Sequence, residues 1–140
     1  MHIGIEVKKD DVHIVYVSGN QQALLATKEL KLHIDGESIK SLVDFRKNLQ
    51  MLFVEDLVDK VSLVEGNSDS SKMRVRIEFL IAEICFLLNI PLATFSSSHL
   101  KKLKDKTFEN SMAQKFKDYY GKFGLHVYSE NAFVVAWRFS

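Results

Sequence analysis

The side chains of this sequence that could do chemistry are carboxylates and lysines, because the usual motifs of other chemistries are absent. The histidines have no metal-ligand spacing, and neither HExxH nor CxxC occurs, so no zinc site is expected. The nucleophile elbow GxSxG and the phosphate loops GxGxxG and GxxxxGKS/T are also absent. The sequence therefore argues against triad hydrolases and against kinases or dehydrogenases that need a nucleotide cofactor.

Three glutamates lie near the ends of predicted elements. Glu6 falls in a first strand, Glu65 follows a later strand, and Glu130 precedes a last helix. Carboxylate oxygens are the ligands that hard divalent cations prefer. Each glutamate also has an ordinary structural explanation, as the solvent face of an edge strand, a turn residue before Gly66, or an acid favoured by the helix dipole. Spacing alone does not show whether the three side chains meet.

The second half of the chain contains a basic segment, although the net charge of the whole chain is only +1. Residues 99–122 hold seven lysines against three acidic residues. Either a solvated helix face or a phosphate-contacting edge explains this pattern. The aromatic residues Tyr119, Tyr120 and Phe123 alternate with these lysines, which suits either base stacking or packing in a helix core. The near-neutral total argues against non-specific binding of nucleic acid.

The hydrophobic pattern predicts a β-β-β-α-β-α-β-α-α order. Period-two alternation indicates strands over residues 3–7, 12–17, 26–34, 60–64 and 90–95. Helical spacing indicates four helices, over residues 38–57, 73–88, 110–123 and 129–139. A further short helical segment carries Leu100 and Leu103. We therefore expect an α/β fold with a mixed five-stranded sheet, a three-strand antiparallel meander plus two parallel strands, and helices on both faces.

Composition limits the class of protein further. With 140 residues and 46% hydrophobic residues, the chain suits one globular domain. The single Cys85 lies in an apolar helix and is expected to be a reduced core residue. In the same helix Glu83 needs a partner, for which Arg76 or Lys102 is available. Neither a membrane span nor a secretion signal is apparent, so a cytoplasmic location is expected.

Four segments resemble the ribonuclease H (RNase H)-like fold in its RuvC-type branch, the Holliday-junction resolvases. Ile3-Gly4-Ile5-Glu6 resembles the Gly-x-Asp pattern of the first strand, with Glu6 at the usual Asp position. Val61-Ser62-Leu63-Val64-Glu65 resembles the fourth strand, which ends in a catalytic Glu. Residues 95–102 and Ala113-Gln114-Lys115 resemble the stretch after the fifth strand, with its apolar-Lys pair and Ala-x-Lys. Residues 130–136 resemble the last helix, where an Asp precedes an Ala-rich run.

The resemblance implies a single RNase H-like domain over residues 1–140 that uses Mg²⁺ or Mn²⁺ to cut phosphodiester bonds. The residues that it implies as catalytic and metal-binding are Glu6, Glu65 and Glu130, with Asn131 as a further metal ligand. The residues that it implies as phosphate contacts are Lys101, Lys102 and Lys115. A nucleic-acid partner, DNA in preference to RNA, and a homodimer follow from the resemblance to resolvases.

Departures from the resolvase pattern leave the activity open. The resolvases have Asp in at least two site positions, whereas all three acidic candidates here are Glu, and Asn131 is neutral. The chain also resembles short bacterial proteins of unknown function grouped with this fold. One hypothesis is therefore a metal-dependent nuclease, and the alternative is an inactive binding or interaction module. An ATPase role, known for longer members of the fold, is the third hypothesis and lacks the necessary phosphate loops.

Overall fold

The computed structural model describes residues 1–19, 24–34, 38–66, 70–105, 117 and 124–139. Its centre is a five-stranded sheet with the strand order β3-β2-β1-β4-β5. The strands are β1 (His2–Lys8), β2 (Asp11–Gly19), β3 (Leu24–His33), β4 (Lys60–Val64) and β5 (Leu92–Phe95). Strands β1 to β3 form the predicted antiparallel meander, and β4 and β5 continue the sheet in parallel. The predicted fold class is confirmed.

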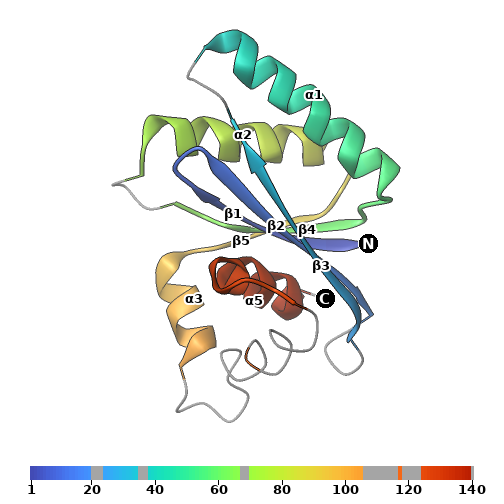
Figure 1. The fold of residues 1–140 in the computed structure, drawn as a ribbon, viewed down its shortest axis with the longest axis vertical. Helices are drawn as coiled ribbons and strands as arrows, with labels where there is room; N and C mark the ends of the chain where they lie inside the picture. Colours follow the sequence, from blue (N-terminus) through green and yellow to red (C-terminus); the bar gives the residue numbers. More distant parts are fainter. Residues whose placement is uncertain (20–23, 35–37, 67–69, 106–116, 118–123, 140) are drawn as a thin grey trace.

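The central strand β1 is covered on both faces of the sheet, which explains why its residues from His2 to Val7 are all buried. Helices α1 (Ile39–Glu55) and α2 (Lys72–Leu87) cover one face. Helices α3 (Ser97–Lys104) and α5 (Glu130–Phe139) cover the other face (Figure 1). A short 3-10 turn, η1 (Val127–Ser129), leads into α5.

Serine side chains fix where three helices begin. The hydroxyls of Ser38, Ser71 and Ser96 each accept a hydrogen bond from the backbone N–H three residues later. These bonds satisfy N–H groups that have no partner within the helix. Helix α1 ends at Glu55, two residues before the predicted end, because Leu57 has a positive φ of 52°. This backbone conformation is incompatible with continuing a right-handed helix.

Two hydrophobic cores lie on opposite faces of the sheet. The larger core packs β1, β2 and β4 against α1 and α2, with Phe53, Leu49 and Ile77 fully or nearly fully buried. It also buries Cys85, and that burial raises the pKa of the thiol to about 11, in agreement with an unreactive core residue. The smaller core packs α5 against β1, β2 and β4 and includes Phe133 and Trp137.

Two details differ from the sequence predictions, and one predicted helix lies outside the described residues. Strand β5 begins at Leu92 and not at residue 90, because Pro91 has no N–H for the ladder. Glu83 pairs with Arg46 of α1 at 2.7 Å, and not with Arg76 or Lys102, because α1 packs beside α2. The helix predicted over residues 110–123 lies outside the described residues, apart from the helical residue Lys117.

Candidate nucleic-acid interface

The buried carboxylate of Glu6 is the centre of a polar network between the sheet and α5. The residue is only 5% exposed, although it lies near the carboxyl end of β1. Asn131 Nδ2 of α5 donates a 2.7 Å hydrogen bond to Glu6 Oε2. Lys8, two residues further along the same face of β1, places its Nζ 3.2 Å from Glu6 Oε1. A buried carboxylate needs such partners, because burial removes its hydration.

A second lysine joins the network from α3. Lys104 Nζ donates a 2.8 Å hydrogen bond to Asn131 Oδ1 and lies 3.7 Å from Glu130 Oε1. This bond orients the Asn131 amide, so its oxygen faces Lys104 and its nitrogen faces Glu6. The positions suit the helix dipoles as well, because Lys104 ends α3 and Glu130 begins α5. The result is a row of alternating charges from Lys8 through Glu6 to Lys104 and Glu130.

Glu65 lies just beyond this network, at the end of the neighbouring parallel strand. Val64 is the residue that pairs with Glu6 in the sheet, so the exposed Glu65 comes one position later. Its backbone N–H donates to Phe95 O at 2.9 Å. The following turn is held by α2, where Glu78 accepts hydrogen bonds from the Gly66 N–H and from Arg74 Nε. The Arg74–Glu78 pair was not predicted from the sequence, although its i,i+4 spacing is a usable signal.

The arrangement of these acids does not fit a pair of divalent cations. Within the part of the chain that the structure describes, no three His, Cys, Asp or Glu side chains are grouped to hold a metal ion. The oxygen of Asn131 faces an ammonium group, and Glu6 and Glu130 are each paired with a lysine. A two-metal site needs several oxygen ligands directed at the ions. The metal-binding role predicted for Glu6, Glu65, Glu130 and Asn131 remains a prediction.

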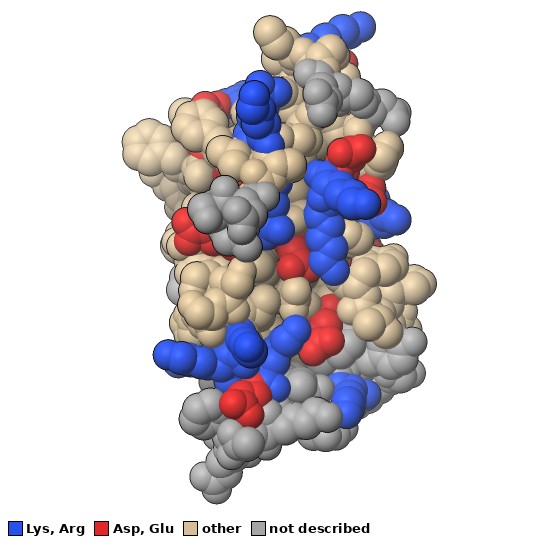
Figure 2. Space-filling model, turned by 90° about the vertical axis from the view of Figure 1, so that its left-hand side faces the viewer, with Lys and Arg blue, Asp and Glu red and all other residues tan. Residues whose placement is uncertain are grey.

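Lysines border the acidic centre on two sides. Lys101 and Lys102 are exposed on α3, and Lys8 and Lys9 lie at the turn between β1 and β2. Figure 2 shows basic side chains above and below the acidic side chains in the middle of this face. The third lysine predicted to contact phosphates, Lys115, lies outside the described residues.

His13 is a buried residue beside Glu6 that the sequence analysis did not select. It faces Glu6 across the β1–β2 pair and is 4% exposed. Burial is the main reason why its pKa is lowered, and the nearby Lys8 adds to the shift. Among the described residues, its Nδ1 has no hydrogen-bond partner. The clue in the sequence was a histidine in the middle of an apolar strand.

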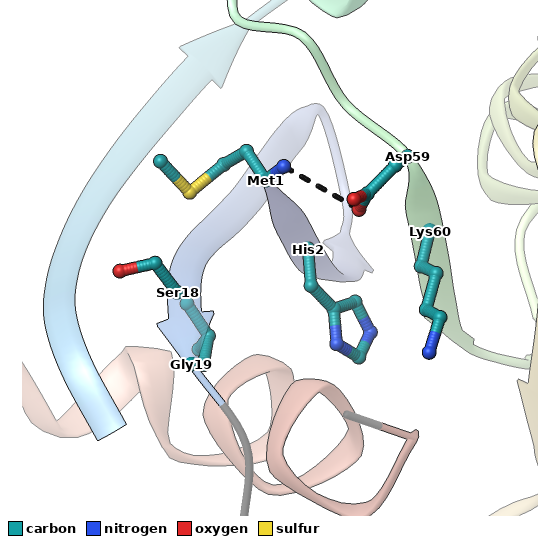
Figure 3. Close-up of a pocket in the computed structure, with 7 residues that line it drawn as sticks. Met1, His2, Ser18, Gly19, Asp59 and Lys60 are labelled. Carbon is teal, nitrogen blue, oxygen red and sulfur yellow. Dashed lines mark ion pairs between the residues drawn. The ribbon is translucent and has the colours of Figure 1, made fainter. Parts of the chain in front are cut away.

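A shallow pocket of about 170 Å³ lies at the opposite end of the sheet, where β1 and β4 begin. Met1, His2, Ser18, Gly19, Asp59 and Lys60 line it, and the Met1 amino group pairs with Asp59 at 3.4 Å (Figure 3). Ligand pockets usually hold about 300 Å³ or more, and ligands of open α/β sheets bind beyond the carboxyl ends of strands. Neither the size nor the place of this pocket indicates a ligand site.

His2 in this pocket predicts an acid-sensitive fold. Burial is the main cause that lowers its pKa from 6.5 to about 4, and its Nε2 lies 3.0 Å from Ser62 Oγ. The unfolded chain therefore binds a proton below pH 6.5 that the folded chain does not accept. We expect the free energy of unfolding to fall by about 2 kcal/mol between pH 6.5 and pH 5. Urea denaturation at several pH values measures this change.

A His2→Asn variant is the control for this pH dependence. His13 also has a lowered pKa and contributes with the same sign, so only the difference between the variant and the wild type reports on His2. We expect a flatter pH profile in the variant. Parallel profiles for the two proteins would contradict the assignment.

The chain is similar to known proteins in structure and not in sequence. No family model matches the chain, and no curated protein matches it in sequence. The structure of Thermus thermophilus RuvC has a TM-score of 0.64 at 12% identity, over 96% of this chain and 89% of that chain. The complex of T. thermophilus RuvC with a Holliday junction substrate has a TM-score of 0.65 at 11% identity, over 96% of this chain and 88% of that chain.

A viral enzyme shows the same architecture. The Fowlpox virus resolvase, in complex with Holliday junction DNA, has a TM-score of 0.61 at 10% identity, over 99% of this chain and 97% of that chain. None of the described helices is both long and apolar enough to cross a membrane.

The strand order, the helices on both faces and the similarities to these solved structures lead to one conclusion: the chain has an RNase H-like fold of the RuvC type.

Proposed function

We propose that this protein binds branched or locally unpaired nucleic acid, DNA in preference to RNA, across the lysine-bordered face around Glu6, without hydrolysing it. The observation that carries the proposal is the position of Lys104. Its ammonium group lies 2.8 Å from Asn131 Oδ1 and 3.7 Å from Glu130, so a cation of the protein itself already lies among the oxygens of this site.

Lysines on two sides of the centre support the binding part of the proposal. Lys101 and Lys102 are free to extend from α3, because both are exposed, and Lys8 and Lys9 lie beyond the other side of Glu6. Ammonium groups that contact phosphates release counterions, which drives binding. Two of the similar structures contain Holliday junction DNA, which makes branched DNA the first substrate class to test.

The ion pairs support the absence of hydrolysis. Phosphodiester hydrolysis in a two-metal site needs cations that activate a water and stabilise the leaving oxygen. Lys8 and Lys104 neutralise Glu6 and Glu130, but an ammonium group cannot perform the first of these tasks. The same pairs keep negative charge in the centre from repelling a nearby phosphate. The network therefore suits binding better than catalysis.

A metal-dependent nuclease is the second candidate, and the position of Glu6 favours it. This carboxylate is buried at the edge where parallel strands end, and the ion pair of its Oε1 with Lys8 lacks the geometry of a hydrogen bond. In this candidate, Glu6, Glu65 and Glu130 with Asn131 hold Mg²⁺ or Mn²⁺ once Lys8 and Lys104 have moved. A homodimer and a cytoplasmic location are further proposals that accompany either candidate.

Binding and cleavage can be separated with one panel of labelled substrates. The panel contains a four-way junction, a flap, a single strand and an RNA–DNA hybrid, each incubated with Mg²⁺ or Mn²⁺. The proteins are the wild type, Glu6→Gln and Glu65→Gln, with folding checked by circular dichroism. We expect the wild type to bind the junction or the flap, to yield no cleavage products, and to bind equally well after Glu65→Gln.

Two results would overturn the proposal in different ways. Metal-dependent cleavage that disappears in both glutamine variants would establish the nuclease candidate and identify its substrate. Absence of binding to all four substrates by folded wild-type protein at low salt would contradict both candidates, and would direct the search towards a protein partner.

A further inference from the structure

Three aromatic rings form a stack beside the Glu6 network. The ring of Tyr128 in η1 lies parallel to the ring of His126, with 4.9 Å between centroids and an interplanar angle of 5°. The ring of the buried His13 also packs against the Tyr128 ring, with 4.7 Å between centroids and an interplanar angle of 47°. Because His13 faces Glu6 across the sheet, the stack runs from the polar network out to His126.

Glu29 of β3 holds the outer end of this stack in place. Its carboxylate accepts hydrogen bonds from the His126 backbone N–H at 2.9 Å and from Ser129 Oγ at 2.6 Å, and it also pairs with His126 Nδ1. Burial by itself raises the pKa of Glu29, but the hydrogen bonds from Ser129 and His126 outweigh it and give a net lowering. A charged Glu29 therefore fixes the His126 ring before any ligand arrives.

The fixed ring of His126 is largely open to solvent. Its side chain is 63% exposed, although Tyr128 covers one face and Glu29 contacts one edge. The exposed area must therefore include the second face of the ring. The next residue, Val127, is 67% exposed and adds apolar surface beside it. A flat ring held rigidly with one open face is a suitable platform for another flat ring.

Cationic groups lie next to this platform. Lys31 Nζ is 5.6 Å from the centroid of the Tyr128 ring, and the side chain is 49% exposed. Lys8 Nζ donates a 3.4 Å hydrogen bond to the Tyr128 carbonyl and also pairs with Glu6. The platform is thus connected to the proposed nucleic-acid face through Lys8. A base stacked on an aromatic ring with its phosphate near lysines is the usual arrangement for unpaired nucleic acid.

We propose that the open face of His126 stacks against one unpaired nucleobase, while Lys8 and Lys31 contact the adjoining phosphates. This inference rests on the proposed function and adds its recognition element: the protein selects sites where a base is out of the helix stack. Stacking does not distinguish between bases, because every base has a flat aromatic face. The selectivity is therefore for an unpaired base and not for a sequence.

The test uses 2-aminopurine, a base whose fluorescence is quenched by stacking, placed at an unpaired position of a flap or, in a second substrate, inside the duplex arm. We expect the wild-type protein to change the fluorescence only at the unpaired position. Substituting His126→Ala is expected to abolish this change and to weaken binding by about fivefold to about a hundredfold. Substituting His126→Phe keeps a flat ring and is expected to retain the signal.

A control variant removes an exposed ring elsewhere. Phe86 is 81% exposed on α2, which covers the other face of the sheet, so Phe86→Ala is expected to leave both signal and affinity unchanged. Binding by His126→Ala that is as strong as that of the wild type, with the same fluorescence quenching, would overturn the platform and leave the proposed function standing. No binding by the wild type would overturn both.

Discussion

Replacing Gly4 by alanine is expected to cause a larger loss of stability than the same replacement at Gly66 or Gly124. A Cβ at this position would lie 1.8 Å from the carbonyl oxygen of Ala132 and 2.9 Å from the Cβ of Ala136. Both are atoms of α5, and the first belongs to its backbone, so no side-chain rotation relieves the clash. Helix α5 must move away from β1 to make room, which opens the smaller core.

The expected decrease in the free energy of unfolding is at least about 3 kcal/mol, the upper end of the usual cost of overpacking. Urea denaturation followed by circular dichroism measures it. The matched control is Gly124→Ala, because an added Cβ there meets no heavy atom within 4 Å. Its φ of +69° adds strain of about 1 kcal/mol. A Gly4→Ala variant as stable as this control would show that α5 does not pack as described.

Reversing two charges on α3 is expected to weaken nucleic-acid binding strongly and to change its salt dependence. The double variant Lys101→Glu/Lys102→Glu replaces two exposed lysines of the proposed interface with carboxylates. Lost phosphate contacts and new repulsion are expected to weaken binding to the junction by at least about tenfold. The slope of log affinity against log salt concentration is expected to decrease by about two. Fluorescence anisotropy at several salt concentrations provides both quantities.

The matched control changes the net charge equally on the other side of the molecule. Lys40 and Lys47 are exposed on α1, which covers the opposite face of the sheet, so Lys40→Glu/Lys47→Glu serves this purpose. We expect this variant to retain most of the affinity and the original salt dependence. Equal losses in both double variants would indicate that net charge and not the α3 surface controls binding, which would contradict the proposed interface.

The sequence by itself determined the elements of the described part of the chain and their order, because hydrophobic period and helix caps are local properties. Alternation in β1 and β2, helical spacing in α2 and the Ser38 cap of α1 are all confirmed by the structure. The glycine of the Ile3-Gly4-Ile5-Glu6 motif also has a structural reason, since its missing side chain lets α5 lie directly on β1. Local patterns of this kind survive folding, because tertiary contacts select among them and rarely replace them.

Only the tertiary structure decided what each polar side chain contacts. The pairing of Glu83 with Arg46, of Asn131 with both Glu6 and Lys104, and of Glu29 with His126 joins residues far apart in sequence. Such pairs depend on how helices pack on the sheet, which no spacing in the chain encodes. A charged or amide group takes whichever partner the packing brings within about 3 Å, since leaving it buried without one is costly.

The candidate site illustrates both contributions. From the sequence, Glu6 was identified as a residue of interest and placed on the first strand, and the structure confirms its strand. The sequence did not show that Lys8 and Lys104 neutralise Glu6 and Glu130, or that His13, Tyr128 and His126 stack beside them. Chain order determines which residues occupy the sheet edge, but the packing of α3, η1 and α5 determines which charges and rings meet there.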